Sequence, residues 1–515
     1  MQRRLILGPP GTGKTTRLLQ IAEDWIAHGV DPGRLGFATF TREARRVAIG
    51  RFVEAGIPAG ELTHCRTIHS AMARALALSR SQYTTDKDLS DFCKAHGYRL
   101  TGGTTDLDDD PAPRPGTDDG RLLAWLELGR ARCQTDEETA DQIEHYHERR
   151  AFVLFAKRYR AWLRDIEKHD YTSILETAIR QGIRLPVSHL IIDEAQDLSP
   201  LQIAAMAPTI DAPGTSEVVV AGDDDQAIYG FAGSSPDWLL WLSKRWSTRI
   251  LEQSWRVPKA IHKRAQAIIE RNHERVPKTY KPTEEEGSIG WLRRDDIARY
   301  AEPGTLCVAR TRYAVGHIAG HLHDARIPYL TERGSGPNPL GRPKTLRAIE
   351  AAALVAQGEP VDAADLSVVL DMLPSSRRPG ALCPWGVKTR VNDIAGDVTR
   401  SELVGLGLDP LAQALTQDHI EPLAKVPPMD RLYYRQLWTT HGKIPRPQVR
   451  LSTVHGVKGR EADRVILCPS LPKVVEMERR TGSFEAENRI AYVALTRAKH
   501  SVGILDPVGR WWFEY

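Results

Sequence analysis

Gly8-Pro9-Pro10-Gly11-Thr12-Gly13-Lys14-Thr15 lies near the start of this 515-residue chain and decides how the rest of it is interpreted. The stretch fits the phosphate-loop template G-x-x-x-x-G-K-[S/T] at every fixed position. Glycines let the backbone turn tightly, so that successive N–H groups point at phosphate oxygens. The template predicts that Lys14 reaches the β- and γ-phosphates of a nucleotide and that the Thr15 hydroxyl binds Mg²⁺.

The sequence on both sides of the loop has the character that the template requires. Leu5-Ile6-Leu7 is a short apolar run that predicts a buried strand, and residues 16–22, which begin with Thr16, predict a helix. Such a helix would direct the positive end of its dipole at a bound anion. The alternative is a chance glycine-rich turn, which would not require strand, loop and helix to fall in this order.

Composition and charge set broad limits on the class of protein. The chain is 41% hydrophobic and 26% charged, as expected of a globular protein, and its length predicts about three or four domains. Its formal net charge of +4 neither requires nor excludes nucleic acid, because a local basic groove can exist in a balanced chain.

The cysteines and the apolar runs indicate the cellular compartment in which the protein is expected. The six cysteines are scattered and form no C-x-x-C pair, which indicates a reducing compartment and neither a disulfide framework nor a thiolate metal site. No apolar run approaches the ~20 residues of a membrane span, and the first strand leaves no room for a signal peptide. We therefore expect a cytoplasmic protein with no membrane partner. A prokaryotic or phage origin is a separate expectation, which these features do not test.

A second motif follows a strongly apolar run far along the chain. Leu190-Ile191-Ile192 predicts a buried strand, and Asp193 and Glu194 come directly after it. Beside a phosphate loop this is the Walker B pattern, in which Asp193 holds Mg²⁺ through its water shell and Glu194 orients and deprotonates the attacking water. Taken alone, the same residues could be a strand that ends in a solvated acidic turn.

Residues 218–226 repeat this design, with a buried strand that carries polar side chains, among them Gln226, at its carboxyl end. In open α/β sheets that edge is where ligands bind. Tyr229 and Phe231 follow at once. Such a pair is either core packing or a platform on which nucleic-acid bases stack, and the local sequence favours core packing.

The remainder of the chain predicts a helical insertion and a second α/β unit. Residues 104–119 are acidic and rich in proline, which indicates a solvated loop, and residues 121–164 predict a long helical stretch. The second α/β unit is expected to begin near Arg249. Its elements are predicted at 258–269 (helix), 305–310 (strand), 312–325 (helix), 327–330 (strand), 345–440 (mostly helical), 449–459 (strand and glycine-rich loop), 487–499 (helix) and 502–505 (strand).

Histidines on one predicted helix raise the question of a metal site. His317 and His321 have the i, i+4 spacing of zinc ligands, and His323 follows them. No third ligand and no intervening carboxylate is evident, so the pattern favours a solvated helix face.

Eight motifs in order resemble superfamily 1 helicases of the UvrD/Rep type: GPPGTGKT, ATFT, TIHS, IIDEAQD, AGDDDQAIYGF, LEQSWR, STVHGVKGRE and YVALTRAK. The resemblance implies an α/β fold with two RecA-like P-loop NTPase domains, each with a parallel sheet and a mainly helical insertion. It implies ATP and Mg²⁺ as cofactors, with ATP in the cleft between the two domains. It also implies single-stranded and partial-duplex DNA as partners, and roles in DNA repair or replication.

On this resemblance the two motor domains are each interrupted by an insertion. The predicted segments are 1–80 and 166–247 for the first motor domain, 81–165 for its helical insertion, 248–333 and 445–515 for the second motor domain, and 334–444 for its short helical insertion.

The resemblance also assigns roles to single residues. Gln226 resembles the sensor of the γ-phosphate, and Trp255 stands where the family places an aromatic that stacks on adenine. Arg256 and Arg497 resemble two arginine fingers of the second domain, whose guanidinium groups stabilise charge on the transferring phosphoryl group. The predicted catalytic set is Lys14, Glu194, Gln226, Arg256 and Arg497. The predicted nucleotide-binding set is Gly8, Pro9, Pro10, Gly11, Thr12, Gly13, Lys14, Thr15, Thr16, Trp255, Arg256, Gly459, Glu461 and Arg497, and the predicted metal ligands are Thr15 and Asp193.

The predicted DNA contacts come from both motor domains. They are Thr39, Phe40, His69, Tyr229, Phe231, His455 and Lys458, and the aromatic members resemble base-stacking residues. The resemblance thus reverses the local preference for a core role at Phe231.

The function that this resemblance implies is ATP-dependent translocation on single-stranded DNA with 3′→5′ unwinding. One alternative is a DNA-stimulated ATPase that remodels nucleoprotein and unwinds poorly alone. Another is a binding module with a decayed ATP site, against which the complete catalytic set argues. A small-molecule P-loop kinase would need no second motor domain.

Overall fold

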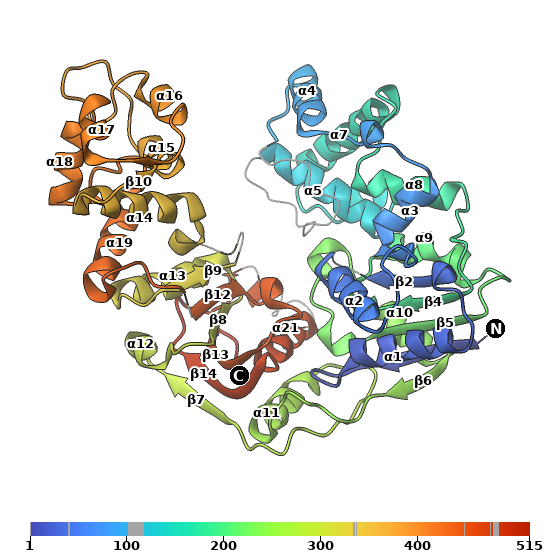
Figure 1. Cartoon of the computed structure of the whole chain (residues 1–515). Coiled ribbons are helices and arrows are strands. Elements are labelled where there is room, and N and C mark those ends of the chain that lie inside the picture. Colours follow the sequence, from blue (N-terminus) through green and yellow to red (C-terminus); the bar gives the residue numbers. More distant parts are fainter. Residues whose placement is uncertain are drawn as a thin grey trace. The chain divides into compact units, whose positions relative to one another are not determined.

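The computed structural model describes residues 2–39, 42–100, 118–332, 335, 337–447, 449–473, 475–476 and 484–515. Contacts within the chain divide it into two compact units (Figure 1). Unit 1 contains residues 1–286 and 483–496, and unit 2 contains residues 287–482 and 497–515. Each unit has its own six-stranded parallel sheet, which confirms the predicted fold class of two RecA-like α/β domains.

The sheet of unit 1 has the strand order β3-β2-β4-β5-β1-β6, and every neighbouring pair is parallel. Its strands are β1 (Gln2–Leu7), β2 (Leu35–Thr39), β3 (His64–Thr67), β4 (His189–Ile192), β5 (Glu217–Gly222) and β6 (Ser247–Ile250). Alternate residues of a strand face opposite sides of a sheet. Leu190 and Val220 accordingly belong to one apolar core, and Ile191 and Val219 to a second core on the other face.

Helices cover both faces of this sheet, which is why its central strands are continuous apolar runs. These helices are α1 (Lys14–Ala27), α2 (Arg42–Glu54), α3 (Ile68–Ala75), α8 (Tyr171–Arg180), α9 (Pro200–Ile210) and α10 (Asp237–Ser243). Two further helices, α11 (Lys259–Ile269) and α21 (Glu485–Leu495), pack against each other within unit 1. The strand and the helix predicted on the two sides of the phosphate loop and the strand predicted before the Walker B acids are confirmed.

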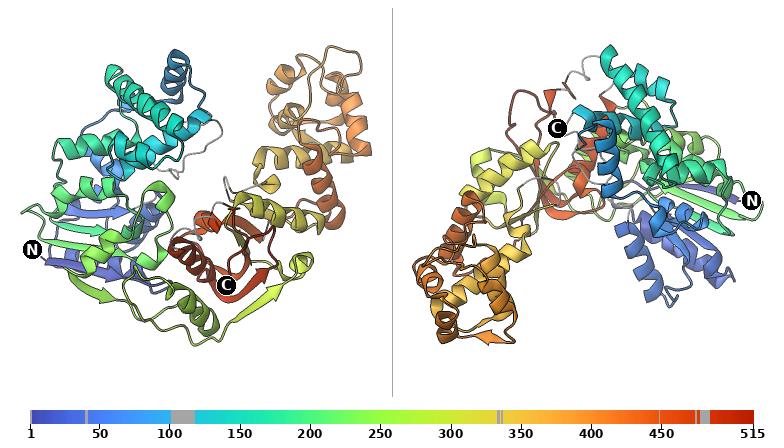
Figure 2. Two further views of the ribbon diagram at one scale, coloured as in Figure 1. Left: turned by 180° about the vertical axis from the view of Figure 1, so that it is seen from behind. Right: turned by 90° about the horizontal axis from the view of Figure 1, so that it is seen from above.

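A helical segment of unit 1 has a core of its own. It contains α4 (Asp86–His96), α5 (Asp118–Ala131), α6 (Asp136–Asp141) and α7 (Tyr146–Asp165), which lie away from the sheet in both Figure 1 and Figure 2. Phe92, Phe152, Phe155 and Tyr159 are buried between them. The stretch predicted as one helical region is three helices, because Thr135 forms a capping box that starts α6. Most of the predicted acidic loop lies outside the described residues.

The sheet of unit 2 has the order β7-β14-β13-β8-β12-β9 and is also parallel throughout. Its strands are β7 (Ser288–Leu292), β8 (Thr305–Ala309), β9 (Tyr329–Thr331), β12 (Val449–Thr453), β13 (Ala462–Cys468) and β14 (Ala498–Leu505). Helices α12 (Ile297–Tyr300) and α13 (Arg312–Asp324) connect the early strands.

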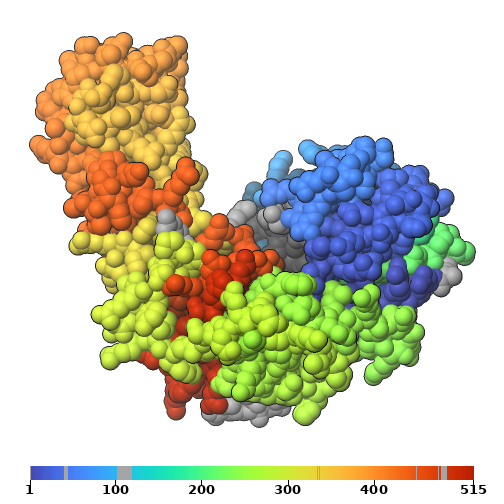
Figure 3. Space-filling view, turned by 60° about the horizontal axis from the view of Figure 1, so that its bottom comes forward, coloured from blue at the N-terminus to red at the C-terminus, as the bar shows by residue number. Residues whose placement is uncertain are grey.

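Residues 343–441 form a mainly helical segment of unit 2, the yellow and orange lobe in Figure 3. Its helices are α14 (Pro343–Gln357), α15 (Ala363–Asp371), α16 (Val387–Asn392), α17 (Arg400–Gly405), α18 (Asp409–Gln417) and α19 (Pro428–His441), with a short antiparallel pair, β10 (Val361–Asp362) and β11 (Asp397–Val398).

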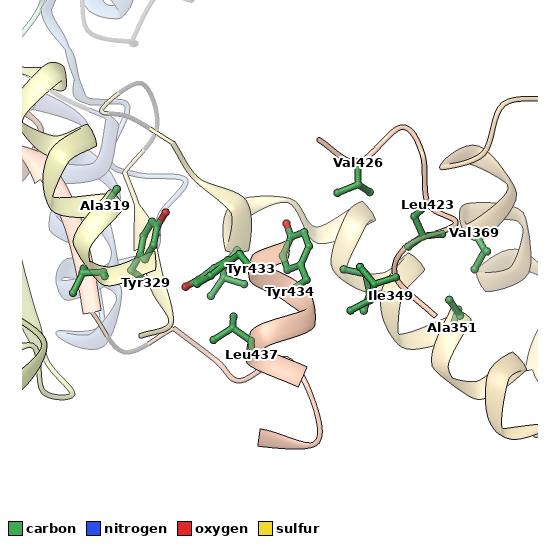
Figure 4. Close-up of a cluster of buried hydrophobic side chains, with 14 of the residues drawn as sticks. Ala319, Tyr329, Ile349, Ala351, Val369, Leu423, Val426, Tyr433, Tyr434 and Leu437 are labelled. Atoms are coloured by element: carbon green, nitrogen blue, oxygen red, sulfur yellow. The ribbon is translucent and has the colours of Figure 1, made fainter. Parts of the chain in front are cut away.

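Two tyrosines of α19 join this segment to the sheet of unit 2. Figure 4 shows Tyr433 and Tyr434 between Tyr329 of β9 and Ile349 of α14. The Tyr433 hydroxyl donates to the Ile327 carbonyl at 2.7 Å, and the Tyr434 hydroxyl donates to the Pro339 carbonyl at 2.6 Å. His323 of α13 stacks on Tyr433, with ring centroids 4.4 Å apart. Both tyrosines are therefore buried with their polar groups hydrogen-bonded.

The two compact units divide between Glu286 and Gly287. β6 is the edge strand of the first sheet, where Leu7 of β1 pairs with Ile250. The predicted boundaries of the motor domains and their insertions, including the start of the second motor domain at residue 248, stay predictions. The closing helix is shorter than expected, because α21 ends at Leu495 and β14 begins at Ala498.

Within the ranges described above, no helix is both long and apolar enough to cross a lipid bilayer.

Arg130 at the end of α5 ties the helical segment of unit 1 to α8. Its guanidinium donates to Asp170 at 2.6 Å (Nη1 to Oδ2) and to Glu176 at 2.8 Å (Nε to Oε1). Burial lowers the pKa of Arg130, but the carboxylates of Asp170 and Glu176 outweigh this and raise it well above its usual value. Removing one partner of such a buried pair leaves the remaining charges unpaired.

We expect Arg130→Met to lower the free energy of unfolding by about 3 kcal/mol or more, because Asp170, whose side chain is only 13% exposed, would lose its cation. The measurement is urea unfolding followed by circular dichroism. Arg164→Met is the matched control, because Arg164 is exposed and a surface substitution changes stability by no more than about 0.5 kcal/mol. Equal unfolding curves for the two variants would contradict the account of Arg130.

Candidate active site

The phosphate loop joins β1 to α1, and its backbone has the turns that the glycines were expected to provide. Gly11 and Gly13 adopt positive φ angles of 72° and 74°, a conformation that residues with a Cβ rarely adopt. The Gly8 N–H donates to the Gly222 carbonyl of β5 at 3.0 Å. The Thr12 hydroxyl donates to the Pro9 carbonyl at 2.8 Å, and Pro10 completes the turn. The loop is thus fixed to the carboxyl edge of the sheet.

Lys14 and Thr15 meet the Walker B acids directly. The Lys14 ammonium lies 2.7 Å from Glu194 Oε1 and 3.9 Å from Asp193 Oδ1. The Thr15 hydroxyl donates to Asp193 Oδ2 at 3.1 Å. Thr16 follows Thr15 in α1. Burial lowers the pKa of Lys14, but the Glu194 and Asp193 carboxylates outweigh it, so the net pKa is raised.

A hydroxyl and a carboxylate are oxygen donors of the kind that Mg²⁺ prefers. Asp193 is 3% exposed, and burial raises its pKa to about 6 although Lys14 opposes the shift. A cation beside Asp193 would favour the ionised form. The residue types at Thr15 and Asp193 therefore fit the predicted metal site.

Glu194 has an unusual backbone conformation. Its φ and ψ are 53° and 41°, which is the left-handed region and costs a residue with a side chain about 1–3 kcal/mol. The Glu194 N–H donates to Asp193 Oδ1 at 2.8 Å, and Gln196 Nε2 donates to Glu194 Oε2. These contacts hold the turn and direct the Glu194 carboxylate at Lys14.

Gln226 is connected to Glu194 through two residues that the sequence reasoning did not single out. Gln196 Oε1 accepts a hydrogen bond from the Asp223 N–H at 3.0 Å. Asp223 Oδ2 in turn accepts from Gln226 Nε2 at 2.8 Å. A chain of hydrogen bonds therefore runs from Lys14 through Glu194, Gln196 and Asp223 to Gln226.

Trp255 and Arg256 lie beside the loop because the backbone around Ser254 is bonded to it. The Ser254 hydroxyl donates to the Pro10 carbonyl at 2.8 Å, and the Trp255 N–H donates to the Gly11 carbonyl at 2.8 Å. Arg256 belongs to unit 1 with the loop, whereas the sequence placed it on the second motor domain. The Trp255 side chain is 76% exposed next to the loop.

The other predicted nucleotide-binding residues gather in unit 2. Arg497 lies between α21 and β14, and its guanidinium donates to the Arg460 carbonyl at 3.3 Å. Glu461 forms an ion pair with Lys499 at 2.8 Å. Gly459 has a positive φ of 82° in the same loop, which also carries His455 and Lys458, two of the predicted DNA contacts.

Two predicted DNA contacts of unit 1 line one pocket of about 80 Å³. His69 of α3 and Phe231 lie on its wall together with Glu127 of α5, Tyr171 of α8 and Asp197. His69 stacks on Tyr171 with ring centroids 3.4 Å apart, and burial lowers the pKa of His69 to about 3. Burial, helped by the Asp170 charge, raises the pKa of the Glu127 carboxyl to about 7.

Phe231 is 40% exposed, which is not the exposure of a core residue. Tyr229 contacts it edge-on, with ring centroids 5.9 Å apart. The interpretation of Phe231 as core packing, which the local sequence favoured, therefore does not hold. Thr39 is the last described residue of β2, and Phe40 lies outside the described residues.

Several residues with important contacts were missed by sequence reasoning. Gln196 and Ser254 lie within the quoted motifs IIDEAQD and LEQSWR but were given no role, and Tyr171 lies in no quoted motif. Lys278 and Arg275 bind the Asp223-Asp224-Asp225 run, and that run was a usable signal, because three adjacent acids at a buried strand end require cations.

Two family models match this chain. The UvrD/REP helicase N-terminal domain matches residues 1–247, and the UvrD-like helicase C-terminal domain matches residues 416–505.

Curated proteins are similar over parts of the chain. YjcD of Bacillus subtilis (strain 168) is 29% identical over 167 residues, which cover 28% of this chain and 22% of YjcD. The ATP-dependent DNA helicase PcrA of the same strain is 24% identical over 307 residues, covering 57% of this chain and 41% of PcrA. PcrA of Staphylococcus aureus (strain Mu50 / ATCC 700699) is 23% identical over 287 residues, covering 53% and 39%. The chain thus spans less than half the length of each of these relatives.

Among solved structures, arterivirus nonstructural protein 10 (helicase) matches at 12% identity over 98% of this chain and 59% of that chain. Its TM-score of 0.33 is too low to support a statement about this chain.

The two loop glycines give a matched pair of substitutions. A Cβ on Gly11 would lie 2.5 Å from the Arg256 Cβ, whereas a Cβ on Gly13 would meet no atom closer than 4.0 Å. Both residues have nearly the same positive φ, so that each alanine pays the same backbone strain of about 1–2 kcal/mol.

We therefore expect Gly11→Ala to lower the free energy of unfolding by about 1–3 kcal/mol more than Gly13→Ala, because only Gly11→Ala also creates a clash with Arg256. Urea unfolding of both variants without nucleotide measures this difference. Equal losses of stability would show that the segment 254–256 does not press on the loop.

Proposed function

Because this chain belongs to the UvrD/Rep family of superfamily 1 helicases, we propose that it is an ATP-dependent translocase on single-stranded DNA and a 3′→5′ DNA helicase. The observation that carries the proposal is the hydrogen-bonded chain from Lys14 to Gln226 beside the phosphate loop. It joins a phosphate-binding cation, a carboxylate and an amide at one sheet edge, which is the set that nucleoside triphosphate hydrolysis needs.

The Lys14–Glu194 pair suggests how substrate prepares the site. A bound γ-phosphate would give the Lys14 ammonium a new anionic partner, which frees the Glu194 carboxylate to accept a proton from water. The water oxygen would then form a bond to the γ-phosphorus, and the bond to the β–γ bridging oxygen would break, giving ADP and phosphate. Mg²⁺ held by Thr15 and Asp193 would neutralise phosphate charge.

Arginine side chains would stabilise the charge that develops during this step. Arg256 is held beside the loop within unit 1 by the bonds of Ser254 and Trp255. The family resemblance adds Arg497, which unit 2 carries, as a second arginine for the same reaction.

DNA would be bound through stacking on exposed aromatic rings. Phe231, a residue that is 40% exposed, lies at a pocket that His69 and Tyr171 also line. Every base has a π-face, so stacking of this kind tolerates any sequence and suits a protein that moves along a strand. The formal net charge of +4 does not argue against DNA binding, because a local group of basic residues can bind the phosphate backbone of DNA.

The test of the proposed function is strand separation on duplexes that carry a 3′ tail, a 5′ tail or no tail. We expect ATP-dependent separation of the 3′-tailed duplex alone, and none by Lys14→Ala, because loss of the phosphate-binding cation costs several kcal/mol of barrier. Separation of the 5′-tailed duplex would contradict the polarity. If DNA stimulates ATP hydrolysis but no duplex is separated, the result would favour the alternative, an ATPase that remodels nucleoprotein.

We expect Phe231→Ala to weaken binding of a fluorescent single-stranded oligonucleotide by about 1–3 kcal/mol, the loss of one stacked base. Fluorescence anisotropy measures it. Trp241→Ala is the control, because Trp241 is a similarly exposed aromatic, 47% accessible, outside the pocket. Equal affinities of the two variants would remove Phe231 from the proposed DNA surface.

A further inference from the structure

Three consecutive buried carboxylates follow β5. Asp223, Asp224 and Asp225 are 0%, 0% and 1% exposed, and Gln226 comes directly after them. Burying a row of like charges is strongly unfavourable unless cations and hydrogen-bond donors compensate for it. The run is conspicuous because the predicted hydrolysis chemistry assigns a role only to Gln226.

One segment, residues 272–280 after α11, supplies the compensation. The Lys278 ammonium lies 3.2 Å from Asp223, 2.5 Å from Asp224 and 2.9 Å from Asp225. Arg275 makes a two-bond contact with Asp225, at 2.9 Å from Nε and 2.6 Å from Nη2. Lys278 is the group that touches all three acids, and its side chain is 1% exposed.

Asp223 has Lys278 as its ion-pair partner, whereas Asp225 also has Arg275. Arg275 neutralises Asp225, and the Val276 N–H donates to Asp224 at 2.8 Å. Burial raises the pKa of Asp223 to about 6, and Lys278 is the first group that opposes this shift. Without Lys278 the Asp223 carboxyl would tend to hold a proton at neutral pH.

The state of Asp223 controls how Gln226 is held. As a carboxylate, Asp223 accepts the hydrogen bond from Gln226 Nε2, which directs the amide oxygen to the opposite side. A protonated Asp223 can donate through its hydroxyl and so allows the amide to turn over. The Asp223 N–H is at the same time bonded to Gln196, which contacts Glu194.

The same segment also binds α21, the helix that precedes Arg497. Asn272 accepts from Asn488 at 2.8 Å and donates to the Glu485 carbonyl at 3.0 Å. Arg489 donates to the Glu274 carbonyl at 2.6 Å, and the Tyr492 hydroxyl donates to the Tyr280 hydroxyl at 3.3 Å. Residues 272–280 therefore contact both the anchor of Gln226 and the helix that ends just before Arg497.

We propose that Lys278 is a positioning residue for ATP hydrolysis, which acts through Asp223 to fix the orientation of Gln226. The inference rests on the proposed function, since it concerns the same reaction. Lys278 lies outside the phosphate loop and is not expected to touch the nucleotide, so its removal should slow turnover without changing nucleotide affinity.

The test is steady-state ATP hydrolysis by the full chain with saturating oligo(dT). We expect Lys278→Met to lower kcat about 10–100-fold, the range for loss of a supporting partner, with KM for ATP unchanged within about twofold. Lys278→Arg keeps the charge and should recover part of kcat. Lys263→Met, at an exposed lysine of α11, is the control and should behave as wild type.

The double variant Lys278→Met/Asp224→Asn distinguishes a purely structural role of Lys278 from a role in positioning Gln226. This double variant restores the local charge balance and should recover thermal stability, while kcat stays low because Asp223 still lacks its cation. It also carries the test if Lys278→Met alone fails to fold. Recovery of kcat along with stability would overturn the inference.

A double-mutant cycle with Gln226→Ala tests the route of action. If Lys278 acts through Gln226, Lys278→Met/Gln226→Ala should be no slower than Gln226→Ala alone. If the fold-losses of kcat caused by the two single substitutions multiply in the double variant, the inference is overturned. If DNA does not stimulate ATP hydrolysis by the wild-type protein, the result counts against the proposed function. If the wild type is active and Lys278→Met is equally active, the result counts only against the role of Lys278.

Discussion

The pairing of buried charges at the carboxyl edge of the first sheet is the constraint on which the rest of unit 1 depends. β1, β4 and β5 are buried and apolar in the halves that lead to their carboxyl ends, and these ends lie side by side where the chain turns into polar residues. Lys14 pairs there with Glu194, and Lys278 pairs with the Asp223-Asp224-Asp225 run. Neither cation nor acid would be stable there alone.

This constraint connects elements that lie far apart in the sequence. Lys14 comes from the first loop, Glu194 from the turn after β4, Asp223 from the end of β5, and Lys278 from the segment after α11. Gln196 bridges two of these turns with its single amide. Because each group satisfies its neighbour, a change at one strand end is felt at the next, which is the property that a nucleotide-dependent site requires.

The sequence predicted those parts whose local pattern is strong. The apolar runs before Gly8, Asp193 and Asp223 are strands that cannot be solvated, and the glycines at 11 and 13 are needed where φ is positive. The helix predicted at residues 16–22, after the phosphate loop, is part of α1.

The remainder depended on contacts between distant residues. β6 is short and exposed, so no apolar pattern marks it, and only its pairing with β1 assigns it to the first sheet. The local sequence favoured a core role for Phe231, whereas the family resemblance favoured a stacking role, and its 40% exposure argues against the core role. Ser254, Gln196 and Lys278 act through hydrogen bonds and ion pairs to residues that are distant in the sequence, and no sequence pattern indicates these partners.

The central claim is that the site built around Lys14 and Glu194 hydrolyses ATP in response to single-stranded DNA. The most direct measurement is the rate of phosphate release from ATP by the full chain, with and without oligo(dT), with duplex DNA as a comparison. The account predicts a low basal rate that rises at least about tenfold with oligo(dT) and little with blunt duplex, as expected when binding at the stacking surface completes the catalytic site. A rate that is substantial yet unchanged by single-stranded DNA would contradict it.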